Sequence, residues 1–247
     1  MRRSSLALAA LVALLGLWVA GDILNVAALT NLTIMPLAVA VVIVGYCYLR
    51  FEERESDAKL IAMIGTLAAL SVAGRVLFAA VPNVKPSTFI IIITGYVFGP
   101  IPGFMVGATT ALVSNLFFGQ GPWTIWQMLA WGLAGLFSGF LGHRRLLEGR
   151  WKMAVYCAAW GFLFGWIMNL YFVLGFVRPI NLSSFVATYS ASLAFDGLHA
   201  AGNFIFAFAL GPALLVMLRR YQSRFFFERE ASIEPLPVLI PDRKRRT

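Results

Sequence analysis

Residues 82–127 read PNVKPSTFIIIITGYVFGPIPGFMVGATTALVSNLFFGQGPWTIWQ, and this stretch organises the rest of the chain. It contains two apolar segments without a charge, bracketed by a polar loop at 82–86 and another at 119–124. The segments meet at Gly-Pro-Ile-Pro-Gly, residues 99–103, where two prolines interrupt a continuous helix. We therefore expect two helices that reverse direction here, with both polar loops side by side at one end of the molecule.

The composition places the chain among membrane proteins. Hydrophobic residues make up 60% of the 247 positions and charged residues only 13%, which does not fit a water-soluble domain. The fold class that we predict is an all-α polytopic membrane protein, because helices satisfy their own backbone groups in lipid. Apolar segments are expected at residues 5–27, 32–49, 60–81, 88–98, 104–118, 125–141, 153–177 and 185–218. The fourth is shorter than the about 20 residues that a spanning helix needs, so we expect its ends to lie in protein or beside a cavity.

The 20 Lys and Arg residues are distributed unevenly along this topology. Seventeen of them fall at one end of the expected helices, only Lys85 and Arg178 fall at the other, and Arg75 lies inside a segment. The positive-inside rule then places both termini in the cytoplasm of a multi-pass protein of the cell membrane. The net charge of +9 is explained by topology and lipid headgroups, so nucleic acid is not an expected partner. A signal peptide at residues 1–21 remains an alternative to a retained first helix.

Small residues recur at helical spacing in two places. Glycine appears every four residues at positions 95, 99, 103 and 107. A second stripe follows the helix expected after residue 58, at Ala58, Ala62, Gly65, Ala69 and Ala73. Such faces let another helix approach closely. The pattern leaves open whether that helix belongs to the same chain or to a partner.

Polar and ionisable residues inside apolar segments are the main site candidates, because each is costly in lipid unless paired or hydrated. We expect Arg75 and Asp196 to lie at similar depth and to form an ion pair, which could belong to a site or to the scaffold. His199 and Asn203 share a helix face with Asp196. Loop residues and nearby tryptophans can stack on a ring or face an acidic group. The expected substrate-binding set is Asn83, Lys85, Gln120, Trp123, Trp126, Gln127, Arg75, Asp196, His199 and Asn203.

Motifs for catalysis and nucleotide binding are missing from the sequence. It has no Walker A loop and no Gly-x-Ser-x-Gly elbow, and two histidines are too few for a metal site. We therefore assign no catalytic residue, no metal and no cofactor. Three function classes remain: a binding protein energised by separate ATPases, a self-sufficient proton-coupled carrier using Asp196 and His199, and an intramembrane enzyme using His199.

Two longer stretches carry a family resemblance. Residues 82–139 together with the closing FDGLHAAGNFIFAFALGP, residues 195–212, resemble the substrate-binding S component of energy-coupling factor (ECF) transporters. The resemblance implies a vitamin-like ligand, bound from outside, and a transmembrane coupling subunit that carries two cytoplasmic ATPases. It places Ala58 and Ala62 in the stripe that docks on this subunit. The PNVKP and GQGPWT loops look closest to members assigned to cobalamin.

The resemblance also divides the chain into three parts. It covers residues 58–220, which are expected to form a six-helix substrate-binding bundle. Residues 1–57 add an N-terminal helix pair and a charged connector, which depart from the six-helix pattern. Residues 221–247 are expected to form a basic cytoplasmic tail.

Overall fold

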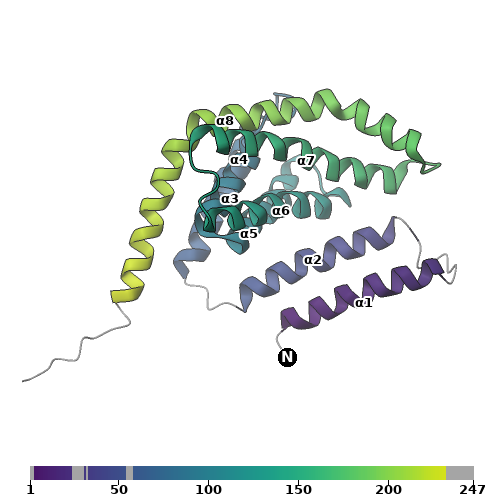
Figure 1. Ribbon diagram of the computed structural model, residues 1–247, viewed down its shortest axis with the longest axis horizontal. Coiled ribbons are helices and arrows are strands. Elements are labelled where there is room, and N and C mark those ends of the chain that lie inside the picture. Colours follow the sequence, from purple (N-terminus) through teal and green to yellow (C-terminus); the bar gives the residue numbers. More distant parts are fainter. Residues whose placement is uncertain (1–2, 24–30, 32, 54–57, 232–247) are drawn as a thin grey trace, which may run out of the picture.

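A computed structural model describes residues 3–23, 31, 33–53 and 58–231 of the chain (Figure 1). These residues form helices only: α1 (Arg3–Ile23), α2 (Ile34–Glu52), α3 (Ala58–Leu77), α4 (Ser87–Phe98), α5 (Pro100–Phe118), α6 (Trp123–His143), α7 (Arg150–Phe176) and α8 (Leu182–Ala231). Seven of these helices are long and apolar enough to cross a membrane, and α4 is the shorter eighth. The predicted all-α polytopic fold is confirmed. The signal-peptide alternative, the connector at residues 54–57 and the basic residues 243–246 lie wholly or partly outside the described residues.

The short helix α4 lies at the centre of the bundle. Every residue from Ser87 to Val97 is buried, and α4 contacts α3, α5, α6, α7 and α8. Its 12 residues extend for about 18 Å, whereas the hydrocarbon core of a bilayer is about 30 Å thick. Helix α4 therefore fills only the middle of the bundle and leaves room for a pocket beyond each of its ends.

Gly99 alone forms the turn between α4 and α5. Its φ of 99° lies in a region that glycine adopts without strain. Pro100 and Pro102 belong to the first turn of α5, where a missing backbone N–H costs nothing. The predicted reversal is confirmed, but the connecting loop is shorter than the five residues expected.

Glycines bring α4, α5 and α6 into backbone contact. A Cβ atom at Gly103 would lie 2.5 Å from the carbonyl oxygen of Gly135, and one at Gly95 would lie 2.0 Å from the same oxygen. A Cβ at Gly107 would lie 2.3 Å from the carbonyl oxygen of Trp131. The glycine stripe of the central stretch therefore serves packing within this chain.

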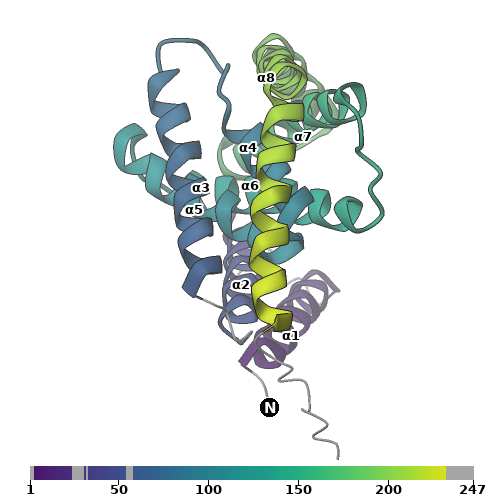
Figure 2. The same ribbon diagram turned by 90° about the vertical axis from the view of Figure 1, so that its left-hand side faces the viewer.

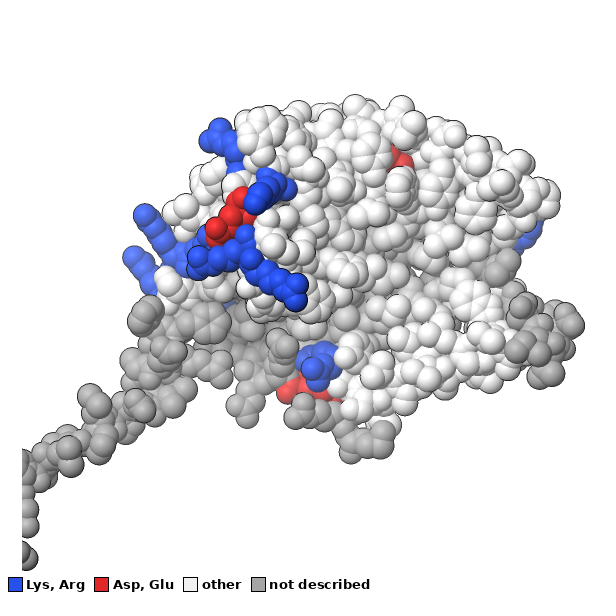
Figure 3. Space-filling model, in the orientation of Figure 1, with Lys and Arg blue, Asp and Glu red and all other residues white. Residues whose placement is uncertain are grey.

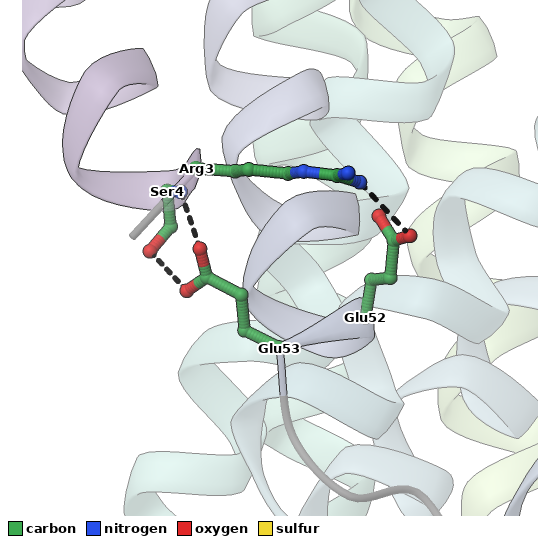
Figure 4. A network of polar contacts seen from close by, with 4 residues as sticks. All are labelled: Arg3, Ser4, Glu52 and Glu53. Atoms are coloured by element: carbon green, nitrogen blue, oxygen red, sulfur yellow. Dashed lines mark hydrogen bonds and ion pairs between the residues drawn. The ribbon is translucent and has the colours of Figure 1, made fainter. Parts of the chain in front are cut away.

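Helices α1 and α2 form a pair beside the other six helices (Figures 1 and 2). The backbone N–H of Ser4 donates to a carboxylate oxygen of Glu53 at 2.6 Å (Figure 4). At the far end of α2, the Thr33 hydroxyl donates to the Leu174 carbonyl oxygen at 2.9 Å. Among the described helices α1 packs on α2, and α2 packs on α5 and α6. The N-terminal pair therefore packs on one side of the bundle, against α5 and α6.

Basic side chains gather at one end of the molecule (Figure 3). We call the end that carries the α6–α7 loop, residues 144–149, the basic end. We call the opposite end, with the α3–α4 loop at residues 78–86, the cavity end. Helix α8 reaches the basic end and continues to Ala231, past the domain boundary predicted at residue 220. It contains Pro212 and changes direction on its way there (Figure 1).

Candidate functional site

A cavity of about 480 Å³ lies at the cavity end, within the size range of small-molecule pockets. Its walls come from α3, α5, α6, α7, α8 and the α3–α4 loop. Among its lining residues are two cations, Arg75 and Lys85, one carboxylate, Asp196, and His199. Apolar and aromatic side chains make up much of the remaining wall.

Six of the ten predicted substrate-binding residues line this cavity: Asn83, Lys85, Gln127, Arg75, Asp196 and His199. The other four, Gln120, Trp123, Trp126 and Asn203, do not. Trp126 is buried and packs against Tyr171, with ring centroids 6.0 Å apart. Trp123 is 37% exposed and its ring packs beside Gly121.

The aromatic wall expected from Trp123 and Trp126 is provided by Trp131 instead. Trp131 and Phe164 both line the cavity, and their ring centroids lie 4.7 Å apart. The Trp131 indole N–H donates to the Thr88 hydroxyl at 2.9 Å, which fixes the ring orientation. These two rings can stack on a planar ligand. The sequence gives little signal for this role, because Trp131 lies inside an apolar run and is typical of a core residue there.

The expected ion pair between Arg75 and Asp196 is absent among the described residues, so that prediction is corrected. The Arg75 guanidinium donates to Asn115 Oδ1 at 2.8 Å. It also lies over the rings of Phe118 and Trp131, 4.6 and 4.9 Å from their centroids. The Arg75 side chain finds its partners on α5 and α6 instead of α8. Both charges are left on the cavity wall.

A hydrogen-bond network joins Arg75 to the loop at residues 119–124. The Asn115 amide donates to Gln127 Oε1 at 2.8 Å and to Thr124 Oγ1 at 2.9 Å. The Thr124 hydroxyl donates to Gln120 Oε1 at 2.9 Å. The loop therefore reaches the cavity through Asn115 and Gln127, and Gln120 supports this network from outside.

Asp196 presents a buried carboxylate that no cation neutralises within the described part of the chain. It is 3% exposed. Its Oδ2 accepts a hydrogen bond from the Ser192 hydroxyl at 2.8 Å, and Asn169 donates to Ser192 at 2.6 Å. A buried carboxylate is costly without donors or a counter-charge. A ligand that supplies an N–H or O–H group would offset this cost, which makes Asp196 a strong binding candidate.

His199 combines burial with an unused ring nitrogen. It is 3% exposed, and its Nε2 lies 2.8 Å from the Thr88 hydroxyl. Its Nδ1 has no hydrogen-bond partner among the described residues. A ligand in the cavity could supply that partner. Asn203, one turn further along α8, is fully buried with both amide atoms unpartnered, but it does not line the cavity.

Lys85 uses its ammonium group to close the α3–α4 loop. Its Nζ donates to the carbonyl oxygens of Phe78, Val81 at 2.6 Å and Ala79 at 3.4 Å. These carbonyls follow the C-terminus of α3, where a cation is favourable. Partial burial, and then the nearby Arg75 charge, lower the pKa of Lys85 below its usual value. Lys85 therefore holds the cavity rim together, and its hydrogen bonds leave it poorly placed for the direct anion contact that we expected.

The small-residue stripe of α3 lies on the surface, away from the bundle interior. Its members Ala58, Ala62, Gly65, Ala69 and Ala73 are all exposed. Apolar grooves of about 410 Å³ and 530 Å³ flank α3, beside α5 and α8 respectively. Packing within the described part of the chain therefore does not account for this stripe.

Comparison with known proteins identifies the family. Residues 55–220 match the family model described as ECF-type riboflavin transporter, S component. The chain belongs to this family. This S component is 30% identical over 180 residues to a UPF0397 protein of Vibrio atlanticus (strain LGP32), covering 68% of this chain and 96% of the relative. It is 32% identical over 101 residues to a UPF0397 protein of Aliivibrio salmonicida (strain LFI1238), covering 38% and 55%. No solved structure matches it significantly.

The match begins just before α3 and ends in α8. The family unit is thus the six-helix bundle α3–α8, and α1 and α2 lie outside it. The chain is a multi-pass membrane protein, and its family is that of the substrate-binding membrane component of ECF transporters. The resemblance inferred from residues 82–139 and 195–212 is confirmed at this level.

Proposed function

We propose that this S component binds a vitamin-like micronutrient in the cavity and delivers it to a separate coupling subunit that carries two ATPases. The observation that carries the proposal is the polar lining of the cavity in an otherwise apolar bundle. Asp196 and His199 are each 3% exposed and both line the cavity. Among the described residues, His199 Nδ1 has no hydrogen-bond partner and the Asp196 carboxylate has no cationic partner. Buried polar groups of this kind are expected to find partners, and a ligand supplies them.

The charge distribution supports binding from outside the cell. Basic residues cluster on one side of the molecule (Figure 3), which is the distribution of a cytoplasmic face. Arg145 and Arg219 lie near the end of α4 that is opposite the cavity. The cavity then opens outward and both termini lie in the cytoplasm. Inward release requires energy, and the sequence contains no nucleotide-binding loop.

The cavity chemistry favours a ligand with a flat ring system, several hydrogen-bonding groups and a negative charge. Trp131 and Phe164 offer the stacking surface, and Asp196 and His199 offer polar contacts. Arg75 and Lys85 exceed Asp196 in charge, so an anionic group on the ligand would balance the cavity. The phosphodiester of cobalamin meets this requirement, in agreement with the two loop sequences, whereas riboflavin is neutral. The family description names riboflavin, so both vitamins belong in the first test.

The ligand can be identified by mass spectrometry of small molecules released from the protein purified after growth in rich medium. Calorimetric titration with cobalamin and with riboflavin then measures each affinity. We expect one of them to bind with 1:1 stoichiometry. Binding of neither vitamin, with no small molecule co-purifying, would contradict the proposal.

Docking on the coupling subunit is assigned to the exposed stripe of α3. A surface of Ala and Gly flanked by two apolar grooves accepts a partner helix at close range. Ala58 and Ala62 lie at the basic end of this stripe, where a subunit connected to cytoplasmic ATPases would be reached. Co-purification of the S component with the coupling subunit tests this assignment.

A proton-coupled carrier is the second candidate, because Asp196 and His199 are buried titratable groups on one helix face. Their hydrogen bonds do not favour it. Asp196 is hydrogen-bonded to Ser192 and His199 to Thr88, and no hydrogen bond among the described residues connects Asp196 with His199. Transport assays without ATPases separate the two candidates.

A further inference from the structure

A second pocket lies at the basic end, beyond the C-terminus of α4. It has a volume of about 410 Å³ and is independent of the ligand cavity. Its walls come from the end of α4, the end of α6, the α6–α7 loop and α8. The pocket exists because α4 ends before its neighbours do: α6 and α8 continue past Phe98 and enclose the space. We call it the basic-end recess.

Cations outnumber anions around the basic-end recess. Arg145 and Arg219 line it, and both pair with the same oxygen of Glu148, at 3.8 and 3.1 Å. One carboxylate cannot neutralise two guanidinium groups, so a positive charge remains. Several of their guanidinium N–H groups also lack a hydrogen-bond acceptor among the described residues. His143 lines the recess as a further donor.

Two features suggest that the recess is shaped for an occupant. Arg145 has a positive φ of 52°, an uncommon conformation for a residue other than glycine, and such outliers concentrate at binding sites. Tyr96 is 4% exposed and lines the recess, yet its hydroxyl has no hydrogen-bond partner among the described residues. Gln222 holds the wall in place by donating to the Val97 carbonyl oxygen at 2.6 Å.

The surroundings of the recess match the headgroup level of a bilayer. Phe98 and Tyr221 form an edge-on aromatic pair beside it, with ring centroids 6.4 Å apart. Aromatic rings and basic residues are typical of the interface between hydrocarbon and water. Basic pockets between helices on the cytoplasmic side are suited to anionic lipid headgroups.

We propose that the basic-end recess binds the phosphate group of an anionic membrane lipid, with Arg145 and Arg219 as its charged contacts and Tyr96 as a further donor. Phosphate suits the site because it accepts several charge-assisted hydrogen bonds from guanidinium groups at once. A lipid is favoured over a free phosphate because the recess lies where headgroups are concentrated. The lipid would tie α4, α6 and α8 together at this end.

The test counts bound lipid on the delipidated full-length protein by native mass spectrometry. Phosphatidylglycerol is titrated against phosphatidylcholine, which has a phosphate but no net charge. We expect phosphatidylglycerol to bind at least tenfold more tightly. The double variant Arg145→Gln/Arg219→Gln should lose this preference. The matched control Arg144→Gln/Arg220→Gln removes the same charge from two exposed neighbours outside the recess and should keep it.

A variant that should bind the lipid more tightly completes the test, because a protein that fails to fold would not gain lipid affinity. Glu148→Gln releases both guanidinium groups and should strengthen phosphatidylglycerol binding severalfold. Glu52→Gln, which alters an exposed acid paired with Arg3, should have no effect. Equal losses in the two double variants, or an unchanged Glu148→Gln protein, would overturn the proposal. If millimolar inorganic phosphate displaces the lipid, the recess is a phosphate site, and the proposal that a lipid occupies it is wrong.

Discussion

The carboxylate of Asp196 on α8 occupies the space that a side chain at Gly165 on α7 would need. A Cβ atom at position 165 would lie 2.1 Å from Asp196 Oδ1 and 2.4 Å from its Cγ. Both residues line the ligand cavity. The missing side chain at position 165 therefore allows the buried carboxylate to keep its position on the cavity wall.

Gly165→Ala should weaken ligand binding at least tenfold, because the new methyl group displaces the Asp196 carboxylate. A factor of ten corresponds to about 1.4 kcal/mol. Calorimetric titration with the identified vitamin measures the change. Gly175→Ala on the same helix is the matched control, since a Cβ there meets nothing within 4 Å and binding should not change. If both variants bind the ligand with equal affinity, Asp196 does not belong to the binding site.

Asp196→Asn should reduce ligand affinity while stabilising the ligand-free protein. The substitution keeps the shape of the side chain and removes a buried charge that has no cationic partner among the described residues. We expect the thermal unfolding midpoint in detergent to rise or stay constant without ligand, and the stabilisation by added ligand to shrink. A lower midpoint without ligand would mean that the carboxylate serves the scaffold.

Trp131→Phe should weaken ligand binding at least tenfold. The substitution removes the N–H that donates to Thr88 and reduces the area of the stacking surface, and each effect is worth on the order of 1 kcal/mol. Trp123→Phe changes the same residue type outside the cavity and serves as the control. If Trp123→Phe has the larger effect, the ligand lies at the loop and not in the cavity.

Gly65→Trp should abolish co-purification with the coupling subunit and leave ligand binding intact. A large ring on the exposed face of α3 prevents close approach of a partner helix. None of the described residues has an atom within 4 Å of a Cβ at position 65, so folding should tolerate the change. Val155→Trp places the same ring on an exposed position of α7 and should leave the complex intact. Loss of the complex in both variants would mean that α3 has no specific role in docking on the coupling subunit.

The helical architecture could be predicted from the sequence because hydropathy and charge report directly on the membrane. The turn at Gly99 and the burial of Asp196 and His199 followed from proline spacing and the cost of polar groups in lipid. The partners of these groups could not be predicted. Arg75 donates to Asn115 on α5 and does not pair with Asp196 on α8, and no sequence pattern reports which helix supplies the partner of a buried side chain.

The roles of the aromatic and loop residues could not be predicted from the sequence. Trp123 and Trp126 lie beside a polar loop and were expected to stack on the ligand. It is Trp131, about two turns after Trp123 on α6, that lines the cavity. Lys85 is basic and lies in a loop, but the carbonyls after α3 take up its hydrogen bonds. Side-chain direction decides both cases, and it depends on packing between helices that are distant in the sequence.

The central claim is that this chain binds its ligand but depends on other subunits for transport. Uptake of radiolabelled vitamin into proteoliposomes tests it most directly, comparing the chain alone under an imposed proton gradient with the chain reconstituted with its coupling subunit, ATPases and ATP. We predict that uptake requires the additional subunits and ATP. Uptake by the chain alone, driven by the proton gradient, would contradict the account and identify a self-sufficient carrier.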